Sequence, residues 1–150
     1  MFHRAIALYE PGDRILPGNW GRVVAGIGPS HPSFFREYLL ERIRQAEFQA
    51  LPSRMASAFA FDALAAAEAF VHQAGQPIYS YRVELASADA PLHRADITWL
   101  DVLDAYRTFG GVEEWARHYW RGDERQPGRL EVIAQSELIV LERLTPVVAN

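Results

Sequence analysis

The chain has 150 residues, of which 49% are hydrophobic and 23% charged, so it is long enough for one globular domain with a core. Its formal net charge of -4 excludes a protein that coats nucleic acid by bulk positive charge, although all fifteen basic residues are arginines. Cysteine is absent, which excludes disulfides, thiol catalysis and thiolate metal sites, and no apolar run approaches the roughly 20 residues that span a bilayer. We therefore expect one cytoplasmic domain that covers residues 1–150.

The first third of the chain predicts two short strands, a loop and a helix. The apolar run from Phe2 to Tyr9 and the segment from Arg14 to Leu16 are typical of strands, and glycines between Asn19 and Ser30 indicate an irregular loop. From about Pro32 to Glu47, apolar residues recur at intervals of three and four, which predicts a helix. We expect the charged residues of this helix, Glu37 among them, to form its solvated face.

The stretch from Leu51 to Asp62 combines a strand pattern with polar groups that a core does not need. Alternation of Phe59 and Phe61 predicts a strand, and Asp62 can cap an alanine-rich helix that ends at Gly75. A strand-to-helix junction that carries an arginine and hydroxyl groups suits an anion or a nucleotide. The polar groups are Ser53, Arg54 and Ser57. A capping serine and a surface arginine beside an ordinary strand are the structural alternative.

The second half of the chain mixes strands and helices. The clean alternation from Pro77 to Leu85 predicts a strand, and Asp89 to Arg94 is expected to be a connection. Asp96 or Thr98 can cap a helix that reaches Phe109 and is broken at Gly110-Gly111. A helix over Val112–Trp120 and strands over Leu130–Ala134 and Leu138–Leu141 complete the chain. Because crossover helices do not separate the strands regularly, we expect an α+β fold.

Few residue patterns indicate chemistry. The five histidines are scattered, which predicts no metal site, and the chain has no P-loop, no dinucleotide-binding glycine motif and no nucleophile elbow. The acid pairs Asp101/Asp104 and Glu113/Glu114 lie on predicted helices, where solvated faces explain them. Glu131 differs, because it stands at the start of a strand directly after a polar loop and can face a cleft. Glu137, at the start of the next apolar run, is the other candidate catalytic acid.

Together these features resemble the ADP-ribosyltransferase superfamily. The resemblance rests on His3 in the first strand, the Pro-Gly turn after it, Pro52-Ser53-Arg54, Ser57 and Phe59 before a helix, and Glu131 opening a late strand. It is nearest to the rifampin-modifying and DNA-modifying members and to an uncharacterised bacterial domain family of about this length. It implies a split antiparallel β core with flanking helices, NAD as substrate and Glu131 as the catalytic residue. The residues that the resemblance expects to bind NAD are His3, Arg4, Arg54, Ser57 and Phe59.

Departures from the superfamily pattern bear on the acceptor of ADP-ribose. Arg4-Ala5 follows the histidine where Gly-Thr is common, and Phe59 or Phe61 stands where a stacking tyrosine is usual. Arg129, two residues before the glutamate, replaces the Glu or Gln of members that modify protein arginine. The expected acceptor is therefore a nucleic acid, a small molecule or a protein side chain other than arginine. An arginine-rich loop after Trp120, with that tryptophan and Trp20 for stacking, could present a nucleic acid.

The resulting hypothesis is a bacterial NAD-dependent ADP-ribosyltransferase that needs no metal and does not act at a membrane. The sequence leaves open whether such an enzyme serves as a toxin, in defence or in resistance. One alternative keeps the fold without the chemistry, as a catalytically inactive nucleotide- or partner-binding module. A less favoured one is an RNA phosphotransferase of the same fold, whose set of arginines and histidines cannot be placed on this chain.

Overall fold

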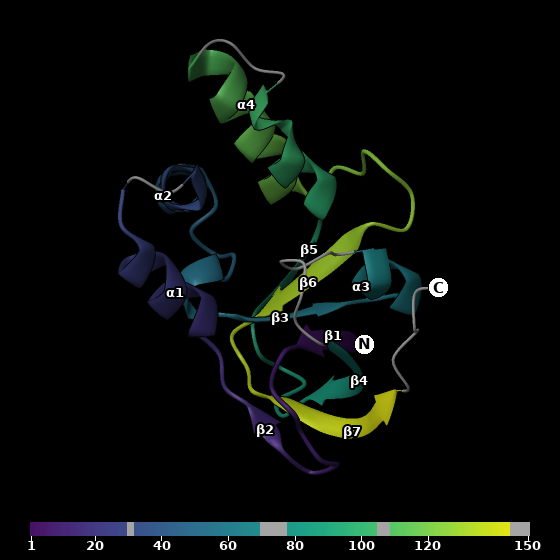
Figure 1. Ribbon diagram of the computed structural model, residues 1–150. Helices are drawn as coiled ribbons and strands as arrows, with labels where there is room; N and C mark the ends of the chain where they lie inside the picture. Colours follow the sequence, from purple (N-terminus) through teal and green to yellow (C-terminus); the bar gives the residue numbers. More distant parts are fainter. Residues whose placement is uncertain (30–31, 70–77, 105–108, 145–150) are drawn as a thin grey trace.

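The computed structural model describes residues 1–29, 32–69, 78–104 and 109–144 (Figure 1). Its strands are β1 (Phe2–Ala5), β2 (Arg14–Ile15), β3 (Ala58–Phe61), β4 (Tyr79–Leu85), β5 (Leu92–Asp96), β6 (Leu130–Ala134) and β7 (Leu138–Leu144). Its helices are α1 (Asn19–Ile27), α2 (Pro32–Glu47), α3 (Leu64–Ala69) and α4 (Phe109–Arg121), with 3-10 helices η1 (Arg54–Ala56) and η2 (Ile97–Asp104). The fold is α+β, as the sequence predicts. Within these ranges, no helix is long and apolar enough to cross a membrane.

The seven strands form one antiparallel sheet in the order β2-β7-β4-β1-β3-β6-β5. Its narrowest junction is between β1 and β3, where a single residue pair, Phe2 with Phe61, joins the strands. By contrast, β1 and β4 share four pairs and β5 and β6 share five. The sheet therefore consists of two halves, β2-β7-β4-β1 and β3-β6-β5, which Figure 1 shows diverging from β1.

Apolar side chains of the two half-sheets form the first core, which we call the split-sheet core. Because successive strand residues point to opposite faces, alternate residues of β3 and β6 contribute to it. Its buried members come from five strands: Ile15, Ala58, Ala60, Tyr81, Val83, Val132, Leu138 and Val140. These members are apolar or aromatic side chains, and their packing joins the two half-sheets.

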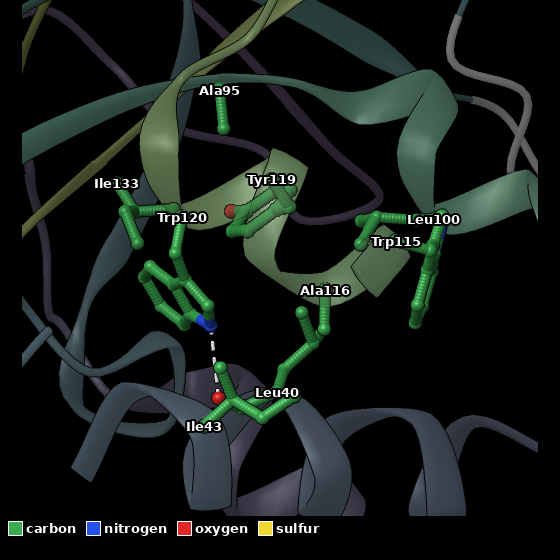
Figure 2. Packing of buried hydrophobic residues seen from close by; sticks show 9 residues of the cluster. All are labelled: Leu40, Ile43, Ala95, Leu100, Trp115, Ala116, Tyr119, Trp120 and Ile133. Carbon is green, nitrogen blue, oxygen red and sulfur yellow. Dashed lines mark hydrogen bonds between the residues drawn. The ribbon is translucent and has the colours of Figure 1, made fainter. Parts of the chain in front are cut away.

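The other face of β3-β6-β5 carries a second core beneath helices α2 and α4 (Figure 2). Leu40 and Ile43 of α2 face an aromatic stripe on α4. The indole of Trp120 donates a hydrogen bond to the Leu40 carbonyl at 2.9 Å, so the stripe also ties the two helices together. The buried residues on α4, η2 and the sheet are Ala95, Leu100, Trp115, Ala116, Tyr119, Trp120 and Ile133.

Most predicted elements are confirmed, with α2 beginning at Pro32 and ending at Glu47 as expected. The predicted loop over 19–30 is wrong, because residues 19–27 form α1. The close approach of α1 to η1 explains the glycine at position 21, since a Cβ there would clash with the Met55 carbonyl. This glycine therefore serves close helix packing rather than a loop. The predicted end of the helix that follows β3, at Gly75, lies outside the described residues.

Two predicted boundaries in the second half of the chain are also wrong. Gly110 and Gly111 lie inside α4, where burial of the aromatic stripe outweighs a helix penalty of about 1 kcal/mol per glycine. The expected connection before Asp96 is strand β5, which lacks β-branched residues and is defined by its pairing with β6. Asp96 does cap the next turn, accepting hydrogen bonds from the Thr98 amide at 2.8 Å and hydroxyl at 2.7 Å.

Candidate functional site

A short segment after α2 carries Arg54 into the interior. Ser53 caps η1 by accepting a hydrogen bond from the Met55 amide, and it donates one to Glu41 of α2 at 2.9 Å. Arg44 of the same helix donates to the Leu51 carbonyl at 3.0 Å. These contacts fix the segment against α2, and the Arg54 side chain points beneath the helices, where it is buried.

Arg54 is the centre of a buried charge cluster, which we define as Glu37, Arg54, Tyr119 and Glu131. Its Nε donates to Glu37 at 2.8 Å, and its Nη1 donates to both Glu131 and the Tyr119 hydroxyl. Tyr119 in turn donates to Glu131 at 2.7 Å. The Arg54 guanidinium also lies over the ring of Phe59, 4.9 Å from its centroid. One guanidinium therefore joins α2, β3, α4 and β6.

Burial and neighbouring charges shift the pKa values of Glu37, Arg54 and Tyr119. Burial by itself raises the pKa of Glu37, but the charges of Arg54 and Arg36 outweigh it and lower that pKa. Burial acts to lower the pKa of Arg54, yet Glu131 and Glu37 raise it well above its ordinary value. Burial also raises the pKa of Tyr119 well above its ordinary value, so the phenol keeps its proton and remains a donor to Glu131.

Three of the residues expected from the sequence, Arg54, Phe59 and Glu131, meet in or against this cluster. Ser57 precedes the same strand as Phe59 and is buried, and its hydroxyl donates to the Ser53 carbonyl at 2.7 Å. This bond supports the turn that positions Arg54. Glu131 itself is only 3% exposed, so in this conformation its carboxylate is enclosed by protein.

The structure does not bring His3 and Arg4 to the cluster. Phe2, Phe61 and Glu131 are paired across β1, β3 and β6 and so share one face, which places His3 on the opposite face beside Tyr81. His3 Nδ1 lies 2.7 Å from the Phe59 carbonyl, at the junction of the two half-sheets. Arg4 donates to the Ala67 and Glu68 carbonyls of α3 at 3.0 and 2.8 Å.

Glu131 lies near the start of β6, whereas Glu137, the other candidate acid, lies just after the end of that strand. It pairs with Arg14 at 2.6 Å across the β2–β7 edge, and about a third of its side chain is exposed. It has no contact with the buried charge cluster among the described residues. The geometry therefore favours Glu131 as the acid of the candidate site.

Glu37 and Tyr119 belong to the site and were not anticipated. The expectation that Glu37 lies on a solvated face is wrong, because its side chain is fully buried. It precedes the buried Leu40 by three residues and Ile43 by six, so all three share one face of α2. In the sequence, the signal for the burial of Glu37 is a single acid on the same helix face as two aliphatic residues that face the core. No feature of the sequence distinguishes Tyr119 from its aromatic neighbours on α4.

Three of the four arginines at positions 117, 121, 125 and 129 contact other groups of the protein. Arg117 pairs with Glu47 and Arg121 with Glu114, both at 2.9 Å. Arg125 donates to the Thr98 carbonyl at 2.8 Å and lies over the Trp99 ring. The idea that Trp120 stacks on a nucleic acid is wrong, because that side chain is 1% exposed and packs in the helical core.

Comparison with protein families identifies one match. The chain belongs to the family described as "Protein of unknown function (DUF2441)", whose model matches residues 22–146. The matched residues run from α1 into the segment after β7, so they include Glu37, Arg54, Tyr119 and Glu131 but not His3 or Arg4. No curated protein matches the chain.

Proposed function

We propose that this member of the DUF2441 family is a cytoplasmic NAD-dependent ADP-ribosyltransferase. In this proposal Glu131 is the catalytic carboxylate, and nicotinamide is released as ADP-ribose passes to an acceptor. The proposal has two supports: an antiparallel sheet that separates into halves at the β1–β3 junction, and the position of Glu131 on a late strand beside β3. The identity of NAD as the substrate rests on the sequence resemblance.

The observation that carries the proposal is the double contact of Glu131 with Arg54 and Tyr119. A carboxylate held by two donors from two separate elements, η1 and α4, is preorganised, as groups that stabilise developing charge need to be. Arg54 is already satisfied by Glu37, Glu131 and Tyr119, so it fits the role of positioning Glu131 better than that of binding a pyrophosphate. This revises the role that the resemblance implies for Arg54.

The chemistry suits a fixed carboxylate. When the bond between ribose C1′ and nicotinamide breaks, its electron pair leaves with the nicotinamide nitrogen, and positive charge develops on the sugar. The acceptor then forms a bond to C1′ and gives up a proton. Glu131 would accept a hydrogen bond from a ribose hydroxyl and stabilise the developing charge, an interaction that strengthens in the transition state.

Access to Glu131 requires a rearrangement. Because the carboxylate is 3% exposed, a ribose can reach it only when Tyr119 or Arg54 moves aside. We therefore expect substrate binding to loosen the buried charge cluster. Such a step would leave Glu131 with one protein donor and one ribose hydroxyl in place of two protein donors.

The acceptor in this proposal is a small molecule or a protein side chain other than arginine. The engaged state of Arg117, Arg121 and Arg125 gives no support to a phosphate-binding loop beside the site. A nucleic acid remains testable by salt dependence, because phosphate contacts release counterions. A rate of acceptor modification that does not change with salt concentration would be consistent with arginines that are paired within the protein.

The test is nicotinamide release from NAD by the wild type and by two matched variants. Glu131→Gln keeps the shape of the side chain but removes its charge, and we expect release to fall by at least about a hundredfold. Glu137→Gln is the control at the other end of β6 and should retain wild-type release. Circular dichroism and urea unfolding establish that both variants are folded. Equal release by Glu131→Gln and the wild type would refute the catalytic role.

A second candidate function is a non-catalytic nucleotide- or partner-binding module. The enclosure of Glu131 in an ion pair favours it, because a structural carboxylate needs no access to substrate. For a nucleotide-binding module, NAD would raise the unfolding temperature, more so at higher NAD concentration, while no nicotinamide is released. If NAD causes neither stabilisation nor nicotinamide release, both the enzyme and the NAD-binding module are rejected.

A further inference from the structure

A cavity of about 760 Å³ that is open to solvent lies between α1, α2 and η1, and Glu131 does not line it. Its volume falls in the range of roughly 300 to 1,000 Å³ that is typical of small-molecule sites. Val24 is buried at its base, and Phe34, Tyr38 and Met55 contribute apolar and aromatic surface. Tyr38 is 58% exposed, so a large part of this ring is available to a ligand. The size and lining suit a molecule with a bulky apolar or aromatic body.

The charges around the cavity differ in whether they are neutralised. Glu37 is paired with Arg54 and Arg36, and Glu41 is paired with Arg44 and accepts a hydrogen bond from Ser53. Arg22 is the exception: within the described part of the chain its exposed guanidinium makes no hydrogen bond or ion pair. The lining therefore presents one uncompensated positive charge beside an apolar surface.

We propose that the α1–α2–η1 cavity binds a small aromatic or aliphatic anion, with the apolar body against Tyr38 and Met55 and the acidic group on Arg22. The ligand class is a carboxylate, sulfonate or phosphate ester with a single apolar moiety. A guanidinium donates two parallel hydrogen bonds to each of these groups. The inference does not depend on ADP-ribosyl transfer, because neither Glu131 nor NAD takes part in it.

The test uses two fluorescent probes that share one apolar body. 8-Anilinonaphthalene-1-sulfonate carries the anionic group, and N-phenyl-1-naphthylamine has the same rings without it. We expect both to bind the folded wild type with enhanced fluorescence, the sulfonate more tightly. Arg22→Gln should weaken the sulfonate by about tenfold, the scale of one charge-assisted hydrogen bond, and leave the neutral amine unchanged.

Filling the cavity provides the second arm of the test. Ala25 is exposed and lines the cavity, so Ala25→Phe should weaken both probes at least about tenfold without unfolding the protein. Val23→Phe places the same side chain on the same helix but away from the cavity, and should leave both affinities unchanged. If Ala25→Phe does not fold, Ala56→Leu fills the cavity from η1.

Three results would overturn the inference. They are wild-type protein that binds neither probe, filled variants that bind both as tightly as the wild type, and an Arg22→Gln variant with unchanged affinity for the sulfonate. A far-ultraviolet spectrum and a cooperative melt for each variant exclude probe binding to unfolded protein. A loss of nicotinamide release in these variants is not required, so failure here is distinct from failure of the proposed enzyme.

Discussion

The two faces of the half-sheet β3-β6-β5 are packed by different kinds of interaction. One face enters the split-sheet core, where Ala58, Ala60 and Val132 pack among apolar and aromatic side chains of the facing half-sheet. The other face lies beneath α2 and α4, and there Glu131 pairs with Arg54 among buried aromatic residues. A single strand, β6, supplies both Val132 and Glu131 from adjacent positions.

The difference shows that the charged groups beneath α2 and α4 require an explanation other than fold stability. Burying apolar side chains stabilises the fold by roughly 25 cal/mol per Å². Removing two carboxylates and a guanidinium from water costs several kcal/mol per ion, which their attraction only partly offsets. An all-apolar version of the helical face would be expected to fold at least as well. The retained cluster on the face that carries Glu131 is therefore consistent with a role in chemistry.

The largest effect that separates the two faces is expected from Arg54→Met. The variant leaves Glu131 buried without its cation and Glu37 with Arg36 alone, so we expect a loss of about 3–5 kcal/mol in the free energy of unfolding. Urea unfolding followed by circular dichroism measures it. A change below about 1 kcal/mol would mean that the two acids reach water or gain protons readily, and that the cluster is not a closed unit.

A smaller loss, without an effect on chemistry, is expected from Leu138→Ala in the split-sheet core. Leu138 is 1% exposed, and truncating a buried leucine costs about 3 kcal/mol through lost packing and the cavity left behind. Nicotinamide release per folded molecule should match the wild type, because the residue lies away from the buried charge cluster. A large fall in release at equal folded fraction would show that both faces act in catalysis.

The pH dependence of stability is expected to distinguish the faces by its slope. The folded pKa of Glu37 lies below its ordinary value of 4.5, so its contribution to stability is present above pH 4.5 and is lost as the pH falls through the folded pKa. Urea unfolding between about pH 7 and 3 should show this decline. Leu138→Ala should keep the wild-type slope, and Arg54→Met should show a shallower one. Identical slopes in all three proteins would contradict the assignment.

Sequence patterns predicted the elements that follow from local chemistry, but only part of the site. The spacing of apolar residues was enough for α2 and β4. The positions of Arg54 at a junction and of Glu131 at a strand start were enough to suggest that they meet. The burial of Glu37 depends on Arg54, which is seventeen residues away, so a pattern within one helix describes the acid as solvated. Long-range pairing of charges carries no periodic signal.

The same limit explains why α1 was not anticipated. Its glycines lower helix propensity, and only the close approach of Gly21 to Met55 shows that one of them serves packing. His3 shows the converse case, because it lies in the expected strand yet faces the side opposite to Glu131. A register shift of one residue reverses the face of a strand residue, and no local pattern fixes that register across the short β1–β3 junction.

The most direct test of the role of Glu131 is a crystal structure of the wild-type protein with an unreactive analogue of NAD. We predict a ribose hydroxyl within about 3 Å of the Glu131 carboxylate, the usual hydrogen-bond length, with Arg54 or Tyr119 displaced from it. An analogue bound elsewhere, with Glu131 still enclosed by Arg54 and Tyr119, would contradict the proposed chemistry. The buried charge cluster would then have a structural role only.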